Sequence, residues 1–154
     1  PNSVSSLACF GGYDINNFDI KMQKKNGVKQ MAMMLKALFS VKWFAKENKK
    51  ISAHTLEAQN EFFDMNILFP KKSFMFLATL NSMINKYKTG KRNYPLLIGC
   101  GSFDISMELE AVKQWKISEP NCRVVIFENA GHCVNMDVPR EFNETMEDFW
   151  TSAE

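Results

Sequence analysis

The sequence predicts an α/β fold with about three parallel strands, helices on their faces, and a helical segment inserted after the first strand. Two observations lead to this prediction. Short apolar runs near the N-terminus and twice in the second half end in glycine or in a loop, as buried parallel strands do. Between these runs, apolar residues recur at three- and four-residue steps, which is the spacing of a helix that buries one face.

The first strand is predicted over residues 4–10, and the glycines at positions 11 and 12 mark the loop after it. Three helices follow: a long one from Gly27, a second over residues 53–66, and a third over residues 73–88, which Thr89 and Gly90 end. The apolar positions of the long helix are Val28, Met31, Leu35, Leu38, Phe39 and Phe44. We therefore predict two units, a helical cap over residues 15–90 and a core over residues 1–14 and 91–154.

The second half alternates strands and helices. A strand is predicted over residues 94–101, then a helix with Ser106 as its N-cap, whose shared face holds Met107, Val112 and Trp115. Residues 123–127 form the next strand. Proline is favoured at the first position of a helix, so Pro139 opens the last one. The predicted inward stripe of that helix is Phe142, Met146, Phe149 and Trp150.

Two residues with the chemistry of an acid–base pair follow consecutive strands. Asp104 lies just after the strand over residues 94–101, and His132 lies 28 residues later, in the loop after the strand over residues 123–127. Loops at the carboxyl ends of neighbouring parallel strands share one edge of the sheet, where ligands and catalytic groups gather. A carboxylate there can bind one imidazole nitrogen and leave the other as a general base.

Each residue also has a structural interpretation, since Asp often forms turns or caps and a single His is often structural. The order of the whole pattern favours catalysis. With these motifs, residues 94–150 resemble the C-terminal part of an α/β-hydrolase, a family whose members carry nucleophile, acid and histidine in that order. Asp104 matches the acid and His132 the histidine. The habitual surroundings of that histidine are matched by Gly131, Asn135, Pro139, Phe142 and Phe149.

The resemblance extends to the start of the chain, which is similar to the strand after the nucleophile helix, while residues 15–90 lie where the family inserts its cap. It implies an esterase- or lipase-like hydrolase with a small-molecule, ester-like substrate and no cofactor. No Ser or Cys occupies a G-x-S-x-G or G-x-C-x-G motif. We therefore expect this chain to be a part of the enzyme and to be inactive by itself. The alternative is a non-catalytic binding or interaction protein on a hydrolase scaffold.

Charge is divided unevenly along the chain. Residues 1–94 hold 15 Lys and Arg against 6 Asp and Glu, a net charge of +9, and residues 95–154 hold 4 against 11, a net charge of −7. A basic cap could attract an anionic substrate, although solvated helix faces are the favoured interpretation. The cap also holds Met31, Met33, Met34, Met65, Met75 and Met83, which fit either an adaptable pocket or, preferably, ordinary helix packing.

Composition narrows the remaining function classes. No nucleic-acid-binding module accompanies the lysine clusters, so we expect no nucleic-acid partner. The cysteines lack C-x-x-C spacing and are interpreted as reduced thiols; they are Cys9, Cys100, Cys122 and Cys133. No metal site is predicted, because His54 has no metal-ligand partner nearby in the sequence. No apolar run has the length of a membrane span, and we expect a cytoplasmic protein.

The first strand raises a further expectation. In the complete family fold, the strand that residues 4–10 resemble is interior, so here it would have an unpaired edge with no proline or lysine to block pairing. We therefore expect self-association, through this edge or by exchange of cap helices. The alternative is a monomer in which the cap covers the edge.

Overall fold

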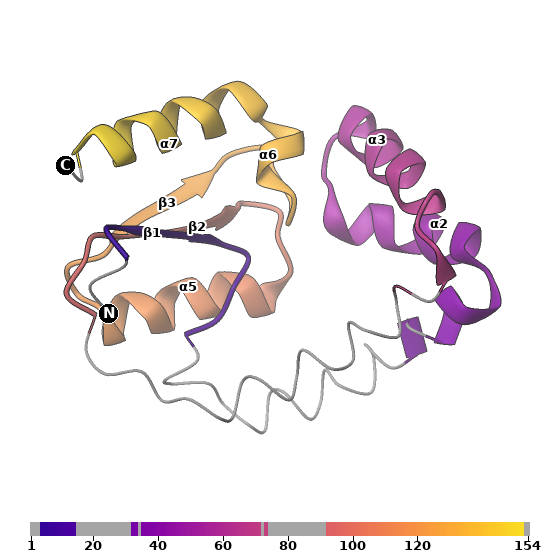
Figure 1. The fold of residues 1–154 in the computed structure, drawn as a ribbon, viewed down its shortest axis with the longest axis horizontal. Helices are drawn as coiled ribbons and strands as arrows, with labels where there is room; N and C mark the ends of the chain where they lie inside the picture. The colour runs from indigo at the N-terminus through magenta and orange to yellow at the C-terminus, as the bar shows by residue number, and fades with distance from the viewer. Residues whose placement is uncertain (1–3, 15–31, 34, 72, 74–91, 153–154) are drawn as a thin grey trace.

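The computed structural model describes residues 4–14, 32–33, 35–71, 73 and 92–152 (Figure 1). Within this part of the chain, three strands form one sheet in the order β1-β2-β3: β1 (Leu7–Phe10), β2 (Leu96–Gly101) and β3 (Arg123–Phe127). Both pairings are parallel, with Leu7 beside Leu96 and Leu97 beside Arg123. The predicted parallel sheet with flanking helices is confirmed.

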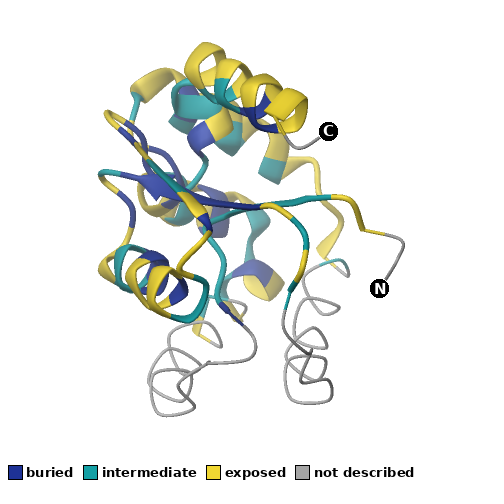
Figure 2. Cartoon of the chain, turned by 90° about the vertical axis from the view of Figure 1, so that its left-hand side faces the viewer, coloured by how far each residue is buried: buried dark blue, intermediate teal, exposed yellow. Residues whose placement is uncertain are grey.

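The sheet is the middle layer of three. Helix α5 (Ser106–Ser118) covers one face and helix α7 (Pro139–Ser152) covers the other (Figure 1). Because successive side chains of a strand point to opposite faces, β2 supplies both layers. Leu96, Ile98 and Cys100 pack with α5, and Leu97 packs with α7. Every residue of β2 is buried, so the core runs along the central strand (Figure 2).

Both covering helices differ in detail from their predictions. Helix α5 begins at Ser106 itself, with Ile105 as an N-cap residue that makes no side-chain capping bond, so Ser106 is not the N-cap. On α7, Met146 and Phe149 are buried as predicted, but Trp150 is 56% exposed. Trp150 lies four residues after Met146 and therefore on the same side of α7, where it lines a groove that is open to solvent.

A short helix, α6 (Val134–Asp137), precedes α7 and was not predicted. It contains four residues, too few to show a hydrophobic period in the sequence. Its Val134 is buried beside Phe127 and Ala130, which fixes the loop after β3 against the core.

The described part of the inserted segment contains two helices that pack on each other, α2 (Val41–Ser52) and α3 (Leu56–Ile67). We call them the helical pair. They lie beyond one end of the sheet, on the side of α6 (Figure 1). The turn between them, residues 53–55, faces the loops that follow the strands.

The long helix predicted from Gly27 is interrupted. Ser40 is in an extended conformation and caps α2 by accepting a hydrogen bond from the Trp43 N–H group. Residues 32–33 and 35–39 are helical before this break. Of the predicted stripe, Phe44 is buried and Leu35, Leu38 and Phe39 are exposed. The helix predicted over residues 73–88 lies outside the described residues after Ser73.

A buried ion pair joins the two points at which the chain leaves the core and returns to it. Arg92 contacts Asp14 at 3.0 Å and also binds Glu119 at the end of α5. The side chains of Arg92 and Asp14 are 8% and 3% exposed. Ser118 also donates a hydrogen bond to Asp14, at 2.8 Å. Buried charges are costly unless paired, so this network fixes residues 14 and 92 against α5.

Among the described helices, none combines the length and the apolar character needed to cross a membrane.

Candidate active site

Two loops at the carboxyl edge of the sheet carry the residues that the sequence singled out. Asp104 lies in the loop between β2 and α5, and His132 lies in the loop between β3 and α6. Backbone hydrogen bonds tie these loops together, from Ser102 N–H to Phe127 O at 2.8 Å and from Phe103 N–H to Ala130 O at 2.9 Å. Because β2 and β3 are parallel neighbours, the two loops emerge side by side.

The structure brings Asp104 and His132 together. Nδ1 of His132 lies 3.2 Å from Oδ1 and 3.3 Å from Oδ2 of Asp104. Oδ1 also accepts a hydrogen bond from the Ile105 N–H group at 2.7 Å, which holds the carboxylate in place. The Asp104 side chain is completely buried, whereas the His132 side chain is 40% exposed. With Nδ1 directed at the carboxylate, Nε2 is left for a proton transfer.

The electrostatic environment favours a basic imidazole. The hydrogen bond with Asp104 raises the pKa of His132 above its ordinary value, while burial acts in the opposite direction. The negative charges of Asp104 and Glu108 add to the increase. This arrangement stabilises the imidazolium that a general base becomes when it accepts a proton.

Gly11, at the end of β1, forms the surface on which the His132 ring lies. A Cβ atom at this position would stand 2.5 Å from Cε1 of His132, so no side chain fits between backbone and ring. Gly11 also has a φ of +61°, a left-handed conformation that glycine adopts at little cost. The sequence indicated Gly11 only as a loop residue, and its contact with His132 was not predicted.

Glu108 is a second carboxyl group near the pair, and it was not singled out from the sequence. It is 3% exposed and hydrogen-bonds Tyr13, and its Oε2 atom has no hydrogen-bond partner among the residues that the structure describes. Burial raises the pKa of Glu108. A signal was present, because Glu108 lies four and seven residues before Val112 and Trp115 and therefore shares their buried helix face.

The thiols are not activated. Burial raises the pKa of Cys100 to about 11 and also raises the pKa of Cys133, the neighbour of His132. All four cysteines are free, with Cys100 and Cys122 buried and Cys9 and Cys133 partly buried. Since the thiolate is the reactive form, none of them resembles a catalytic nucleophile.

An aromatic pair lies beside the acid loop. The ring of His54, in the turn of the helical pair, stacks on Phe103 with a centroid distance of 3.8 Å and an angle of 9°. Phe103 directly precedes Asp104 and is 58% exposed. No cluster of His, Cys, Asp and Glu that could hold a metal occurs among the described residues.

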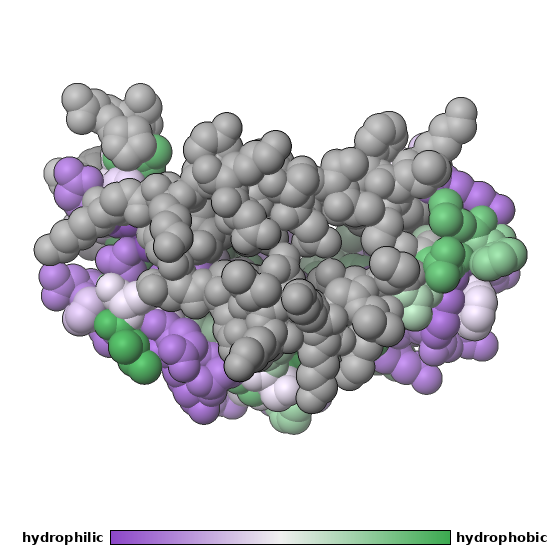
Figure 3. Space-filling view, turned by 90° about the horizontal axis from the view of Figure 1, so that it is seen from below, coloured by the Kyte–Doolittle hydropathy of each residue, from purple (hydrophilic) through white to green (hydrophobic). Residues whose placement is uncertain are grey.

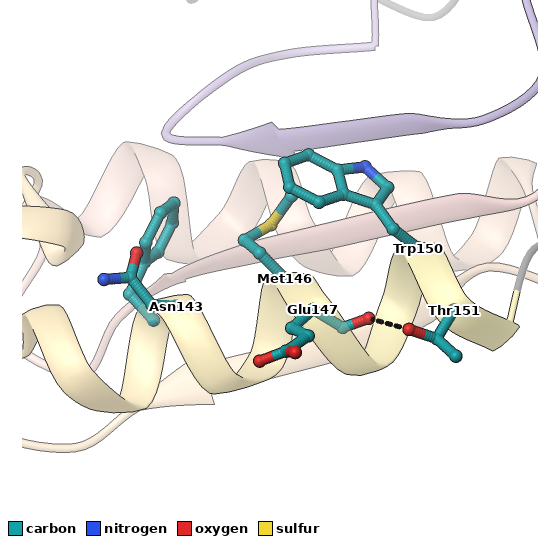
Figure 4. Close-up of a pocket in the computed structure, with 6 residues that line it drawn as sticks. Asn143, Met146, Glu147, Trp150 and Thr151 are labelled. Carbon is teal, nitrogen blue, oxygen red and sulfur yellow. Dashed lines mark hydrogen bonds between the residues drawn. The ribbon is translucent and has the colours of Figure 1, made fainter.

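A groove on α7 is separate from this site. It is lined by one helix alone, with Met146 and Trp150 rising from the same side and Asn143 farther along (Figure 4). Neither Asp104 nor His132 lines it. The acid and histidine therefore stand at the sheet edge, in the part of the molecule that faces the helical pair.

Known structures share this architecture. MenH from S. aureus is similar over 97% of this chain and 60% of its own, with a TM-score of 0.70 and 14% identity. A thermophilic esterase from Thermogutta terrifontis is similar over 97% and 56%, with a TM-score of 0.72 and 13% identity. An esterase from Exiguobacterium antarcticum is similar over 94% and 56%, with a TM-score of 0.70 and 16% identity.

No protein-family model and no curated protein sequence matches the chain. At these identities, the structural likenesses show the fold. The chain has the fold of the C-terminal portion of an α/β-hydrolase, and it spans somewhat more than half the length of these neighbours.

Proposed function

We propose that this chain supplies the acid, Asp104, and the base, His132, of a Ser-Asp-His-type triad in a hydrolase that cleaves an ester-like bond. The observation that carries this proposal is the contact of 3.2 Å between His132 Nδ1 and a buried carboxylate at the carboxyl edge of a parallel sheet. The esterase neighbours share the fold in which this order of elements occurs.

The proposed chemistry assigns one task to each side chain. His132 takes the proton of a nucleophile that attacks the carbonyl carbon, and then gives that proton to the departing alcohol. In the second half-reaction it takes a proton from water as the water oxygen attacks the acyl carbon, and it returns that proton to the nucleophile as the acyl–enzyme bond breaks and the acid product leaves. Asp104 remains ionised and stabilises the imidazolium. The nucleophile and the oxyanion hole are proposed to come from a part of the hydrolase fold outside this chain.

Residues 15–90 are proposed to form the cap over this site, and residues 1–14 and 91–154 the core. Position supports the assignment, because the turn of the helical pair lies against both loops, beside Gly131 and stacked on Phe103. The proposed substrate is a small ester, and an anionic one would suit the basic first part of the chain. Another structural neighbour is described as a membrane phospholipase A, so proteins with this fold include one named for cleaving a lipid ester.

The first test concerns the chain by itself. We expect no hydrolysis of a short-chain p-nitrophenyl ester and no labelling by a fluorophosphonate, because His132 has no nucleophile to activate. Turnover or labelling above background that His132→Ala abolishes would contradict this expectation and reveal a nucleophile within these residues.

The second test uses the chain joined to a nucleophile-bearing N-terminal part. There, His132→Ala should lower kcat by several orders of magnitude, and Asp104→Asn should cause comparable or smaller damage. Glu144→Gln, on the exposed side of α7, is the matched control and should leave kcat unchanged. A His132→Ala enzyme with near wild-type kcat would overturn the proposed role.

A non-catalytic binding protein on the same scaffold is the second candidate. The observation that favours it is the lack of a G-x-S-x-G motif in this sequence. The joined chain decides between the two candidates, because a scaffold that only binds would show no turnover even with a nucleophile restored.

We also propose that the chain self-associates through β1. Within the described sheet, β1 pairs only with β2 and leaves its other edge open. Light scattering during size-exclusion chromatography at micromolar concentration should give a mass above that of the 17.7 kDa monomer. A monomeric mass would contradict the proposal.

A further inference from the structure

One carboxylate attaches the helical pair to the loop that carries His132. Asp137, the last residue of α6, accepts hydrogen bonds from both partners. Figure 1 shows α6 at the end of the sheet nearest α2 and α3. Asp137 is also 33 residues after Asp104 in the chain and has no part in the proposed proton transfer.

Four donor groups converge on this side chain. The Gly131 N–H group donates to Oδ2 at 2.8 Å, from the residue next to His132. On the other side, the His54 N–H group reaches both oxygens, at 2.9 and 3.0 Å. Thr55 donates twice to Oδ1, from its N–H group at 2.7 Å and from its hydroxyl at 2.8 Å. One carboxylate thus satisfies donors from two segments about 80 residues apart.

The same bonds organise the start of α3. The Thr55 hydroxyl donates to Asp137 and accepts from the Ala58 N–H group at 3.3 Å, so Asp137 orients the N-cap of the helix. A negative charge is also favourable at a helix N-terminus. Burial acts to raise the pKa of Asp137, but the hydrogen bonds from His54, Gly131 and Thr55 outweigh it and lower the pKa. The group is therefore ionised at neutral pH.

The two segments are in direct contact around this carboxylate. The Cys133 N–H group donates to Ser52 O at 2.7 Å, at the end of α2. A Cβ atom at Gly131 would lie 3.1 Å from the His54 nitrogen, a tight contact, so the two backbones lie close together here. The stack of His54 on Phe103 adds a contact with the acid loop. The turn of the helical pair therefore touches both loops of the site.

We propose that Asp137 is a positioning residue that holds the turn over residues 53–55 against the His132 loop, so that the helical pair and the Asp104–His132 pair form one mechanical unit. Contacts between a substrate and the helical pair would then change the position of His132. The catalytic meaning of this coupling rests on the proposed function, whereas the coupling itself does not.

The test measures hydrogen exchange at single amides of the 154-residue chain by NMR. Asp137→Asn keeps the size of the side chain but replaces one acceptor with an NH₂ group that faces donors. We expect exchange at Gly131 and His54 to accelerate by about tenfold or more, as loss of a charge-assisted hydrogen bond predicts. The His132 ring resonances should shift as well. Glu144→Gln, which removes an exposed charge, should change neither.

Exchange at Leu97, in the centre of β2, separates positioning from general stability. It should stay within about twofold of wild type in Asp137→Asn if the effect is local. Equal acceleration at Leu97, Gly131 and His54 would show that Asp137 only stabilises the fold and would overturn the proposal. Unchanged exchange at Gly131 and His54 in a folded variant would overturn it as well.

A second variant approaches the contact from the other side. Thr55→Val removes the hydroxyl donor and should accelerate exchange at His54 by a smaller factor than Asp137→Asn, whereas Thr55→Ser should restore the wild-type rate. Because no step of this experiment needs substrate, a failure to find hydrolysis would contradict the proposed function alone. In the joined enzyme, Asp137→Asn should lower kcat more than it raises KM.

Discussion

In the sheet, every residue of β2 is buried between α5 and α7, whereas the helical pair buries few of its large apolar side chains. The buried residues of α2 and α3 are Phe44, Ala45, Ser52 and Ala58, and the exposed apolar ones include Trp43, Ile51, Leu56, Met65 and Ile67. Hydrophobic side chains are visible on the surface at that end of the molecule (Figure 3). The sheet and its covering helices therefore supply their own core, whereas the helical pair depends on its contacts with the loops at the end of the sheet.

A matched pair of substitutions tests this difference most strongly. Leu97 is completely buried in β2, and Leu56 is 72% exposed at the start of α3. Leu97→Ala should lower the free energy of unfolding by about 2–5 kcal/mol, because it removes buried methyl groups and leaves a cavity. Leu56→Ala should change it by less than about 0.5 kcal/mol. Urea unfolding measures both changes, and equal losses would contradict the difference in packing between the sheet and the helical pair.

The buried ion network around Arg92 predicts the next largest loss in the free energy of unfolding. Arg92→Met would remove the cation that pairs with the buried Asp14 carboxylate. We expect a loss of about 3 kcal/mol, the typical cost of an uncompensated buried charge. Arg140, which is 92% exposed and paired with Glu144, supplies the control, and Arg140→Met should leave the urea midpoint unchanged. If both variants shifted the urea midpoint by a similar amount, burial would not be the reason that the Arg92 ion pair stabilises the fold.

The smallest predicted effect is an opposite pH response in the two regions. Asp137, at the joint with the helical pair, has a lowered pKa, so its stabilisation is present above the ordinary value of about 3.9 and is lost as pH falls through the folded pKa. His132 has a raised pKa, so its stabilisation is present below about 6.5 and is lost as pH rises through the folded value.

Side-chain NMR titration can follow both groups in the same sample. Asp137→Asn should remove the acid response at Gly131 and leave the His132 titration in place, and Asp104→Asn should lower the pKa of His132. If Asp104→Asn left the His132 titration unchanged, the carboxylate would not be the source of the increase.

The sequence was most informative where a pattern of apolar residues is bounded by glycine or proline residues that end or begin an element. Residues 123–127 were predicted and found as a strand, and Pro139 begins α7 as expected. The proximity of Asp104 and His132 followed from the rule that loops after neighbouring parallel strands share an edge. These features depend on local pattern and simple topology, which a single sequence records.

Other features depend on tertiary contacts that no local pattern encodes. The helical period could place Glu108 on the buried face of α5, but it could not supply its partner Tyr13, which comes from a distant loop. Asp137 lies two residues before Pro139, and nothing in its local sequence indicates its partners in the turn of the helical pair, 82 and 83 residues away. Only the folded chain brings such donors together.

The ion pair between Asp14 and Arg92 has a consequence for how this molecule can change over evolutionary time. The pair joins two residues that are 78 positions apart in the chain, at the base of the segment between them. The entropy of closing such a loop rises only with the logarithm of its length, by about 0.6 kcal/mol for each doubling. Insertions or deletions that leave residues 53–55 in place would therefore cost the sheet little stability. The length of this segment can change more freely than the positions of the residues that attach it.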